Sequence, residues 1–247
     1  MEPSVPASIT AVLPAYNEEA IIATTVQTTH AALTATGARV EVIVVDDGSV
    51  DGTRAECERL AASLDGVRVL VHPVNRGYGG ALRTGFDAAS GSAVFLMDSD
   101  GQFDPADIAL LLERWDGRAV VCGYRAKRSD PLGRRLNHRA FFAVVDLLFG
   151  RTARDVNCAF KLFPAAVGRG LTAEGALICT ELLVRARDRG HPIVDVAVPH
   201  HPRRTGSPTG AKPSVILRAF VELWRLRERM QRARAAAAPV RSPGLPD

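Results

Sequence analysis

Two carboxylates separated by a single residue, Asp98 and Asp100, stand directly after a run of apolar residues. Asp, Asn and Gly are common in ordinary turns, but polar, acidic and glycine-rich residues follow four successive apolar runs here, which turns alone do not explain. If those runs are strands of one open α/β sheet, ligands bind outside their carboxyl ends. The segments that would then form one binding site are 14–19, 46–53, 75–80 and 98–102.

The spacing of Asp98 and Asp100 suits a hard divalent cation. Two carboxylates at a strand terminus can hold such an ion directly or through water, while its remaining positions take water and substrate phosphates. A cation held in this way neutralises the charge that develops on a departing nucleoside diphosphate. A single Asp-x-Asp motif is most often structural. Here, however, Asp46 and Asp47 stand at an equivalent strand end, which strengthens the interpretation as a metal site.

These segments need a scaffold that brings the strand ends together. Apolar, β-branched runs predict strands at 9–13, 40–45, 67–71, 93–97 and 119–122. Stretches of helical length separate them, at about 18–36, 51–64, 79–90 and 105–114, the last with Asp104 as its expected N-cap and Pro105 at its first position. Repeated strand, helix and strand units imply right-handed crossovers. We therefore expect an α/β fold of Rossmann-like type, with a mostly parallel central sheet flanked by helices.

The regularity of the pattern breaks after residue 123. The segment 134–150 predicts a basic and then apolar helix, 159–163 and 193–198 predict strands, and 181–189 predicts part of a helix. Prolines and glycines between 200 and 213 predict a loop. Residues 214–236 predict a long helix with a wide apolar face and several arginines, and 237–247 a disordered tail.

Composition narrows the class of protein. A chain of 247 residues with 47% apolar residues is long enough for one large α/β domain or two small ones, which excludes a disordered protein. The longest apolar runs are about half the ~20 residues that cross a bilayer, and the N-terminus lacks the pattern of a secretory signal. The four cysteines form no CxxC pair, which argues against a zinc cage and fits a reducing compartment. We expect a soluble, cytoplasmic protein.

The net charge of +4 is unevenly distributed. Residues 203–247 carry ten basic and three acidic side chains, a net charge of +7, so the rest of the chain carries −3. Such asymmetry suggests that the C-terminal part meets something anionic, such as lipid headgroups, phosphates or nucleic acid. A solvated basic helix is the alternative. Nucleic acid is disfavoured because the remaining chain is acidic and has no nucleic-acid motif.

In its ordered motifs the chain resembles the family 2 glycosyltransferases with the GT-A fold, and within them the branch that transfers mannose or glucose to polyprenyl (dolichol) phosphate. The resemblance extends over residues 8–208. The motifs that carry it are Leu13–Glu19, Val45–Thr53, Asn75–Gly85, Met97–Gln102, Gly123–Arg125, Asp155–Phe163, Glu181–Leu183 and His201–Gly206.

The resemblance implies a nucleotide-sugar donor site and a metal cofactor, Mg²⁺ or Mn²⁺. In it, Glu18 meets the ribose hydroxyls, Asp46 or Asp47 approaches the base, and Gln102 makes a further metal or sugar contact. The implied metal ligands are Asp98, Asp100 and Gln102. The implied nucleotide-sugar residues are Pro14, Ala15, Tyr16, Glu18, Asp46, Asp47, Arg76, Asp98, Ser99, Asp100 and Gln102.

The acceptor determines which reaction is catalysed. A polyprenyl phosphate attacks through an oxygen that is already ionised, so it needs cationic positioning rather than a strong base. A sugar hydroxyl would instead need a carboxylate base, for which Asp155 and Glu181 are the candidates. With Asp98 and Asp100 they complete the expected catalytic set. The residues expected to bind the acceptor phosphate or the diphosphate are Arg125, Arg134, Arg139, Arg203, Arg204 and Ser207.

We therefore expect a GT-A catalytic domain at 1–213, a basic amphipathic helix at 214–236 and a tail at 237–247. The helix packs on the domain or lies on anionic lipid at the inner face of the membrane. The leading hypothesis is an inverting transferase that moves a hexose, mannose from GDP-mannose, to a polyprenyl phosphate. Two alternatives remain: transfer from a UDP-, GDP- or dTDP-sugar to a soluble hydroxyl acceptor, and a non-catalytic nucleotide-sugar-binding subunit, which the complete Asp98 and Asp100 pair argues against.

Overall fold

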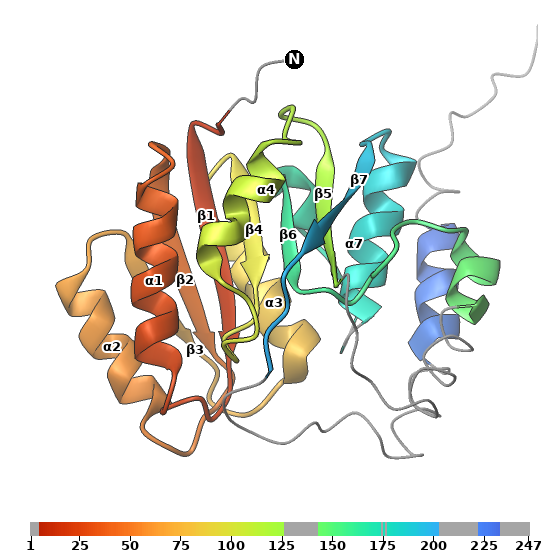
Figure 1. Ribbon diagram of the computed structural model, residues 1–247. Coiled ribbons are helices and arrows are strands. Elements are labelled where there is room, and N and C mark those ends of the chain that lie inside the picture. The colour runs from red at the N-terminus through yellow and green to blue at the C-terminus, as the bar shows by residue number, and fades with distance from the viewer. Residues whose placement is uncertain (1–4, 126–142, 174, 176, 203–221, 233–247) are drawn as a thin grey trace, which may run out of the picture.

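The computed structural model describes residues 5–125, 143–173, 175, 177–202 and 222–232 (Figure 1). The strands are β1 (Ser8–Ala15), β2 (Arg39–Asp46), β3 (Val67–Val71), β4 (Ala93–Met97), β5 (Val120–Arg125), β6 (Phe160–Pro164) and β7 (Ile193–Val198). The helices are α1 (Ile22–Thr34), α2 (Thr53–Ser63), α3 (Gly77–Ala88), α4 (Ile108–Leu112), α6 (Ala165–Gly168) and α7 (Leu177–Asp188). Residues 143–149 and 222–232 are also helical.

The strands form one sheet in the order β3-β2-β1-β4-β6-β5-β7. All pairs are parallel except those of β6, which runs antiparallel to β4 and to β5. The expectation of a mostly parallel sheet is confirmed. What the repeated pattern did not foresee is that β6 separates β4 from β5, two strands that follow each other in the chain.

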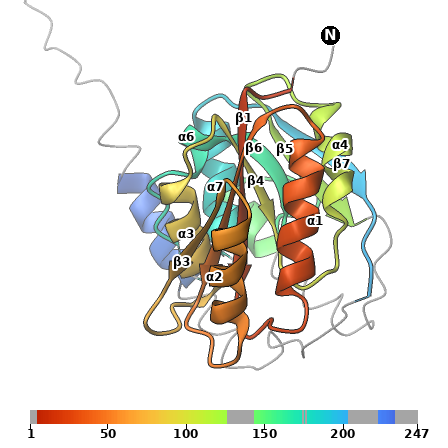
Figure 2. The same ribbon diagram turned by 90° about the vertical axis from the view of Figure 1, so that its left-hand side faces the viewer.

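Each face of the sheet is covered by its own helices (Figure 2). α1 and α4 lie on one face with α2 beside α1, and α3, α6 and α7 lie on the other. Side chains alternate between the two cores along each strand: in β4, Phe95 points to the first and Leu96 to the second. Because both faces are covered, the strands read as continuous apolar runs, which is why the sequence located them well.

Two helix starts illustrate how local chemistry sets element boundaries. The carboxylate of Asp104 accepts a hydrogen bond from the backbone of Ala106 at 3.0 Å, as expected of an N-cap, although the first turn (Pro105–Asp107) is a 3-10 helix. The first helix begins at Ile22 rather than near residue 18. The loop before the helix is not helical at Asn17, where φ is 56°.

The helical residues 222–232 pack against the domain. Leu223, Leu226 and Met230 are buried in the core that α7 helps to form, whereas Trp224 is 58% exposed. Residues 143–149 behave in the same way, with Val145 and Phe149 in the core. In the described part of the chain, no helix has the length and hydropathy needed to cross a bilayer.

Candidate functional site

The strand order places a topological switch point between β1 and β4. From β1 the chain adds β2 and β3 on one side, and then crosses to the other side of β1 to form β4. In open α/β sheets, ligands bind outside the carboxyl ends of the strands at such a point. The segment after β1 begins at Tyr16 and the segment after β4 begins at Asp98, so two of the predicted site segments border this switch point.

On one side of the switch point, the loops after β1 and β2 are hydrogen-bonded to each other. The backbone N–H of Glu18 donates to the Thr53 hydroxyl at 2.8 Å, and the side-chain carbonyl of Asn17 accepts from the backbone of Val50 at 2.9 Å. Tyr16 is 47% exposed beside these contacts. Of the residues expected to hold the nucleoside, Ala15 is buried, Pro14 and Glu18 are half-buried, and the aromatic ring of Tyr16 is accessible to a ligand.

Asp46 and Asp47 have different surroundings although they are adjacent. Both are buried, and Asp46 accepts a hydrogen bond from the backbone of Ser49 at 3.1 Å within its own loop. Asp47 reaches to the turn after β3, where its Oδ1 contacts the His72 ring at 2.6 Å and accepts from the backbone of Arg76 at 2.9 Å. Arg76 itself is exposed.

On the other side of the switch point are Asp98, Ser99 and Asp100. Asp100 is 6% exposed and accepts a hydrogen bond from the backbone of Gln102 at 3.1 Å. Asp98 is half-buried and hydrogen-bonded to Tyr78, a residue of the first turn of α3. Burial, together with the Asp98 carboxylate, raises the pKa of Tyr78 well above its usual range, so the phenol stays protonated and donates.

The donor atoms here fit a magnesium or manganese ion. Carboxylate oxygens are the ligands that these hard cations prefer, and one or two of them are enough when phosphate oxygens and water complete the shell. Within the described residues, no group of three or more His, Cys, Asp or Glu side chains is arranged to hold a metal by itself. The hydroxyl of Ser99, between the two carboxylates in sequence, is buried and has no hydrogen-bond partner among those residues. A site of this composition suits a cation that arrives with a diphosphate.

Gln102 connects this site to the chain that follows β7. Its backbone carbonyl accepts from the N–H of His201 at 2.8 Å, and its side-chain amide donates to the His201 carbonyl at 3.2 Å. The amide therefore contacts protein, which differs from the metal or sugar contact expected of it, although that contact stays a prediction. His201 is two residues before Arg203, so Gln102 fixes the start of the predicted arginine-bearing loop.

Arg125 and Asp155 bind each other. Nε of Arg125 lies 2.7 Å from Oδ2 of Asp155, and Nη2 lies 2.9 Å from Oδ1, a two-pronged ion pair. The side chains are 19% and 6% exposed. Sequence reasoning gave them separate roles, phosphate binding and general base, but the fold brings them together at the end of β5. Both carboxylate oxygens of Asp155 are engaged by the guanidinium.

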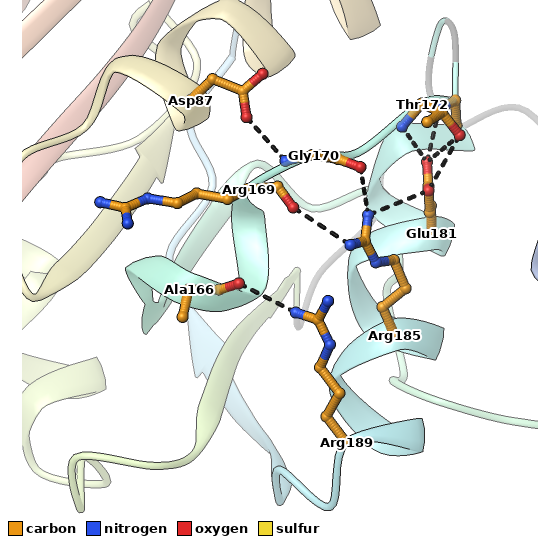
Figure 3. Close-up of polar contacts among 9 residues, drawn as sticks. Asp87, Ala166, Arg169, Gly170, Thr172, Glu181, Arg185 and Arg189 are labelled. Atoms are coloured by element: carbon orange, nitrogen blue, oxygen red, sulfur yellow. Dashed lines mark hydrogen bonds and ion pairs between the residues drawn. The ribbon is translucent and has the colours of Figure 1, made fainter. Parts of the chain in front are cut away.

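Glu181 is likewise engaged, in contacts that hold the segment before α7 (Figure 3). Its Oε2 accepts from the backbone of Thr172 at 2.7 Å and of Ala173 at 2.6 Å. One turn further along α7, Arg185 donates to the carbonyl of Gly170. The carboxylate proposed as a base therefore has two backbone donors, and its contacts are those of a structural anchor.

The remaining sequence predictions lie outside the described residues. They include most of the helix expected at 134–150, both ends of the helix expected at 214–236, and the tail at 237–247. The acceptor-site residues among them are Arg134, Arg139, Arg203, Arg204 and Ser207.

Three residues at or near this site were given no role from the sequence, although Tyr78 lies in the predicted segment 75–80: Tyr78, His72 and Lys161. Lys161 is fully buried in β6 and donates to the carbonyl of Cys158, whose own N–H donates to the backbone of Asp155 at 3.1 Å. A lysine within an otherwise apolar strand is the signal that could have revealed it. Nothing local distinguishes His72 or Tyr78 from ordinary turn residues.

Comparisons with known proteins identify the family and the fold of the chain. A family profile described as Glycosyl transferase family 2 matches residues 10–169. An undecaprenyl-phosphate 4-deoxy-4-formamido-L-arabinose transferase of Pseudomonas aeruginosa (strain LESB58) is 34% identical over 176 residues, 70% of this chain and 50% of that protein. The protein of the same name from Edwardsiella ictaluri (strain 93-146) is 30% identical over 205 residues, 80% of this chain and 61% of its own length. The chain thus spans about half to three fifths of these relatives.

Among solved structures, the glucosyl-3-phosphoglycerate synthase of Mycobacterium tuberculosis has a similar fold. Its complex with Mn²⁺, UDP-glucose and phosphoglyceric acid superimposes with a TM-score of 0.65 at 24% identity, covering 90% of this chain and 80% of the synthase. The same synthase has been solved with Mg²⁺ and UDP, again with a TM-score of 0.65 and 24% identity. At this identity the likeness shows a shared fold.

Proposed function

Because the chain belongs to glycosyl transferase family 2, we propose that it transfers a sugar from a nucleoside diphosphate sugar to a polyprenyl phosphate. It is a glycosyltransferase, and transfer to undecaprenyl phosphate is named in the curated relatives it matches. A single in-line displacement inverts the anomeric carbon. The acceptor phosphate supplies the nucleophile and the nucleoside diphosphate leaves.

The observation that carries this proposal is the state of the two candidate bases. Asp155 engages Arg125 with both oxygens, and Glu181 accepts from two backbone N–H groups. A hydroxyl acceptor needs a carboxylate that can take its proton, whereas a phosphate oxygen is ionised already. A site in which both carboxylates are engaged by other protein groups therefore favours a phosphate acceptor over a hydroxyl.

In this proposal Arg125 contacts the acceptor phosphate and Asp155 orients its guanidinium. A guanidinium has five N–H groups, and the ion pair with Asp155 uses two of them. Its position at the end of β5, two strands from Asp98 across β6, gives the acceptor a place beside the donor. The charges arranged in this way bring the attacking oxygen to the sugar.

For the donor, we propose a UDP-sugar in place of the expected GDP-mannose. The names of the relatives specify an amino-pentose derivative, and the solved neighbours were obtained with UDP or UDP-glucose. Tyr16 and Glu18 face the nucleoside, Asp46 or Asp47 meets the base, and Asp98 and Asp100 hold Mg²⁺ or Mn²⁺. When bound, the metal neutralises charge on the departing diphosphate.

A donor and acceptor panel tests this function. The purified chain is incubated with labelled UDP-sugars and GDP-mannose, with Mg²⁺ or Mn²⁺, and with or without undecaprenyl phosphate in detergent micelles. We expect label to enter the organic phase only when the lipid, a UDP-sugar and the metal are all present. Asp98→Asn and Asp100→Asn should abolish this transfer, while Asp65→Asn, an exposed carboxylate away from the site, should not. Label that appears only in water-soluble product would reject the lipid acceptor.

We further propose that the C-terminal helix contacts the membrane through its outward face. Its inner face is occupied, since Leu223, Leu226 and Met230 are buried, so a lipid contact must use exposed residues. Trp224 is 58% exposed, and arginines 225, 229 and 232 are exposed on the same helix. An aromatic ring among arginines suits the interface of an anionic bilayer.

Vesicle co-sedimentation tests this contact. Trp224→Ala should reduce binding to phosphatidylglycerol vesicles, whereas Gln231→Ala, at an exposed position of the same helix, should not. Equal binding by both variants, or equal binding to neutral phosphatidylcholine vesicles, would reject the proposed contact.

A further inference from the structure

A buried histidine beside the proposed donor site has no role in the chemistry described above. His72 follows β3 and is 5% exposed. Its Nδ1 lies 2.6 Å from Oδ1 of Asp47, and its Nε2 lies 2.9 Å from the hydroxyl of Thr84 on α3. The ring thus joins the end of β2 to a helix that begins at the metal-binding side of the site.

The partners determine where the proton of the ring lies. An ionised carboxylate can only accept, so the hydrogen bond to Asp47 requires a hydrogen on Nδ1. In the neutral ring, Nε2 then accepts from the Thr84 hydroxyl. Asp47 therefore has a donor from a rigid, buried ring, which fixes the orientation of its carboxylate in the way that a second partner orients a ligating or catalytic group.

Asp47 in turn fastens the turn that starts α3. The backbone of His72 donates to the Asp46 carbonyl at 2.9 Å, and the backbone of Arg76 donates to Asp47 at 2.9 Å. The loop after β2 also packs closely against this turn, since a Cβ on Gly48 would lie 2.9 Å from the backbone of Val74 and Asn75. The turn is held to the end of β2 by these bonds and this close contact.

The same turn leads to the metal-binding side of the site. It ends at Gly77, whose φ of 76° redirects the chain into α3. The next residue, Tyr78, is hydrogen-bonded to Asp98. A displacement of the turn would therefore move Arg76 and Tyr78 together, away from the donor and from a metal-binding carboxylate.

We propose that His72 is a positioning residue for the nucleotide donor. By donating to Asp47, His72 holds the carboxylate that faces the base. Through Asp47 it also holds the turn that carries Arg76 and Tyr78. The groups that contact the base and the groups that contact the diphosphate are therefore kept in fixed positions relative to each other. This inference rests on the proposed function, because it presupposes a nucleoside diphosphate at the switch point. It assigns no proton transfer to the histidine.

Two amide variants separate the two ring nitrogens. The side-chain amide of His72→Asn stands where Nδ1 stands and can still donate to Asp47, whereas that of His72→Gln stands near Nε2 and reaches Thr84 instead. Binding of UDP with Mg²⁺ is measured by calorimetry for both, with thermal unfolding to confirm folding. Because His72→Gln takes the ring donor away from the buried Asp47 carboxylate, we expect it to weaken UDP binding about tenfold or more.

The Asn variant should bind UDP within about threefold of the unchanged protein, a difference below 1 kcal/mol. In turnover assays His72→Gln should raise the KM for the donor and leave the KM for undecaprenyl phosphate unchanged. Equal losses in both variants would show that the ring only fills space and would overturn the inference, as would unweakened UDP binding in His72→Gln. If the unchanged protein binds neither UDP nor GDP, the proposed function fails first and the inference falls with it.

Discussion

The ion pair of Arg125 and Asp155 allows a quantitative test of how the acceptor side is built. We expect Asp155→Ala and Arg125→Ala to be strongly non-additive in their effects on the free energy of unfolding. Removing either residue leaves the other charge, largely shielded from water, without its two-pronged partner, whereas removing both leaves neither charge. The two residues are thirty positions apart in sequence, so local helix or strand propensity cannot produce this coupling.

The size of the coupling follows from the burial of the pair. Breaking a fully buried ion pair costs about 3–5 kcal/mol, and an exposed one less than about 1 kcal/mol. Asp155 is 6% exposed and Arg125 is 19% exposed, which places the pair nearer the buried limit. After discounting for the part of Arg125 that water reaches, we expect a coupling energy of about 2–3 kcal/mol, or about 30-fold or more in the unfolding equilibrium.

Urea unfolding of the four proteins in the cycle measures this coupling. Each unfolding curve gives a free energy, and the coupling is the double-mutant change minus the sum of the single changes. Turnover provides a second readout: both single variants should raise the KM for undecaprenyl phosphate, because Asp155 acts through Arg125. A coupling below about 0.5 kcal/mol would refute the pair as a structural unit. A loss of kcat confined to Asp155→Ala would return Asp155 to the role of general base.

Three further predictions concern the scaffold. Gly48→Ala places a Cβ 2.9 Å from backbone atoms at a φ of 75°, so it should cost about 1–3 kcal/mol of unfolding free energy and weaken UDP binding. Leu226→Ala should destabilise by about 2–5 kcal/mol and Trp224→Ala by less than about 0.5, because only the first is buried. Burial raises the pKa of Cys122 and Cys158 to about 12, so both thiols should resist Ellman's reagent in the folded protein near pH 9 and react in urea.

Each of these predictions has a result that would contradict it. Gly37→Ala is the matched control, because Gly37 has a φ of 79° but nothing within 4 Å of the added Cβ, so this variant has the backbone strain without the close contact. Equal UDP binding by the Gly37 and Gly48 variants would show that the close contact at Gly48 does not affect the site. Equal destabilisation by the Leu226 and Trp224 variants would mean that the helix is not packed as described.

The raised thiol pKa values also make the free energy of unfolding depend on pH. The folded pKa is raised above the unfolded value of 9.0, so each thiol contributes stability that is complete below about pH 9 and is lost as pH rises towards 12. Rapid labelling of the folded protein at pH 9 would contradict the burial of these cysteines.

The local pattern of the chain determined much of this protein. Apolar runs located every strand in the described part of the chain to within a few residues, because strands covered on both faces have few polar positions. The polar segments after those strands predicted the donor-side residues, since parallel strands necessarily bring their carboxyl ends to one edge. Asp98, Asp100 and the loops after β1 and β2 needed no knowledge of distant contacts.

Tertiary structure alone decided which of these residues act on each other. Nothing in the sequence pairs Arg125 with Asp155 or His72 with Asp47, because such contacts depend on strand order and on the path of each connection. The position of the antiparallel strand β6 between β4 and β5 is likewise decided by the tertiary structure. It brings the buried Lys161 to the carbonyl of Cys158, in the turn that follows Asp155. Side-chain chemistry and spacing thus specify what a site can bind. The packing of elements distant in sequence specifies which charges meet substrate and which hold the site in place.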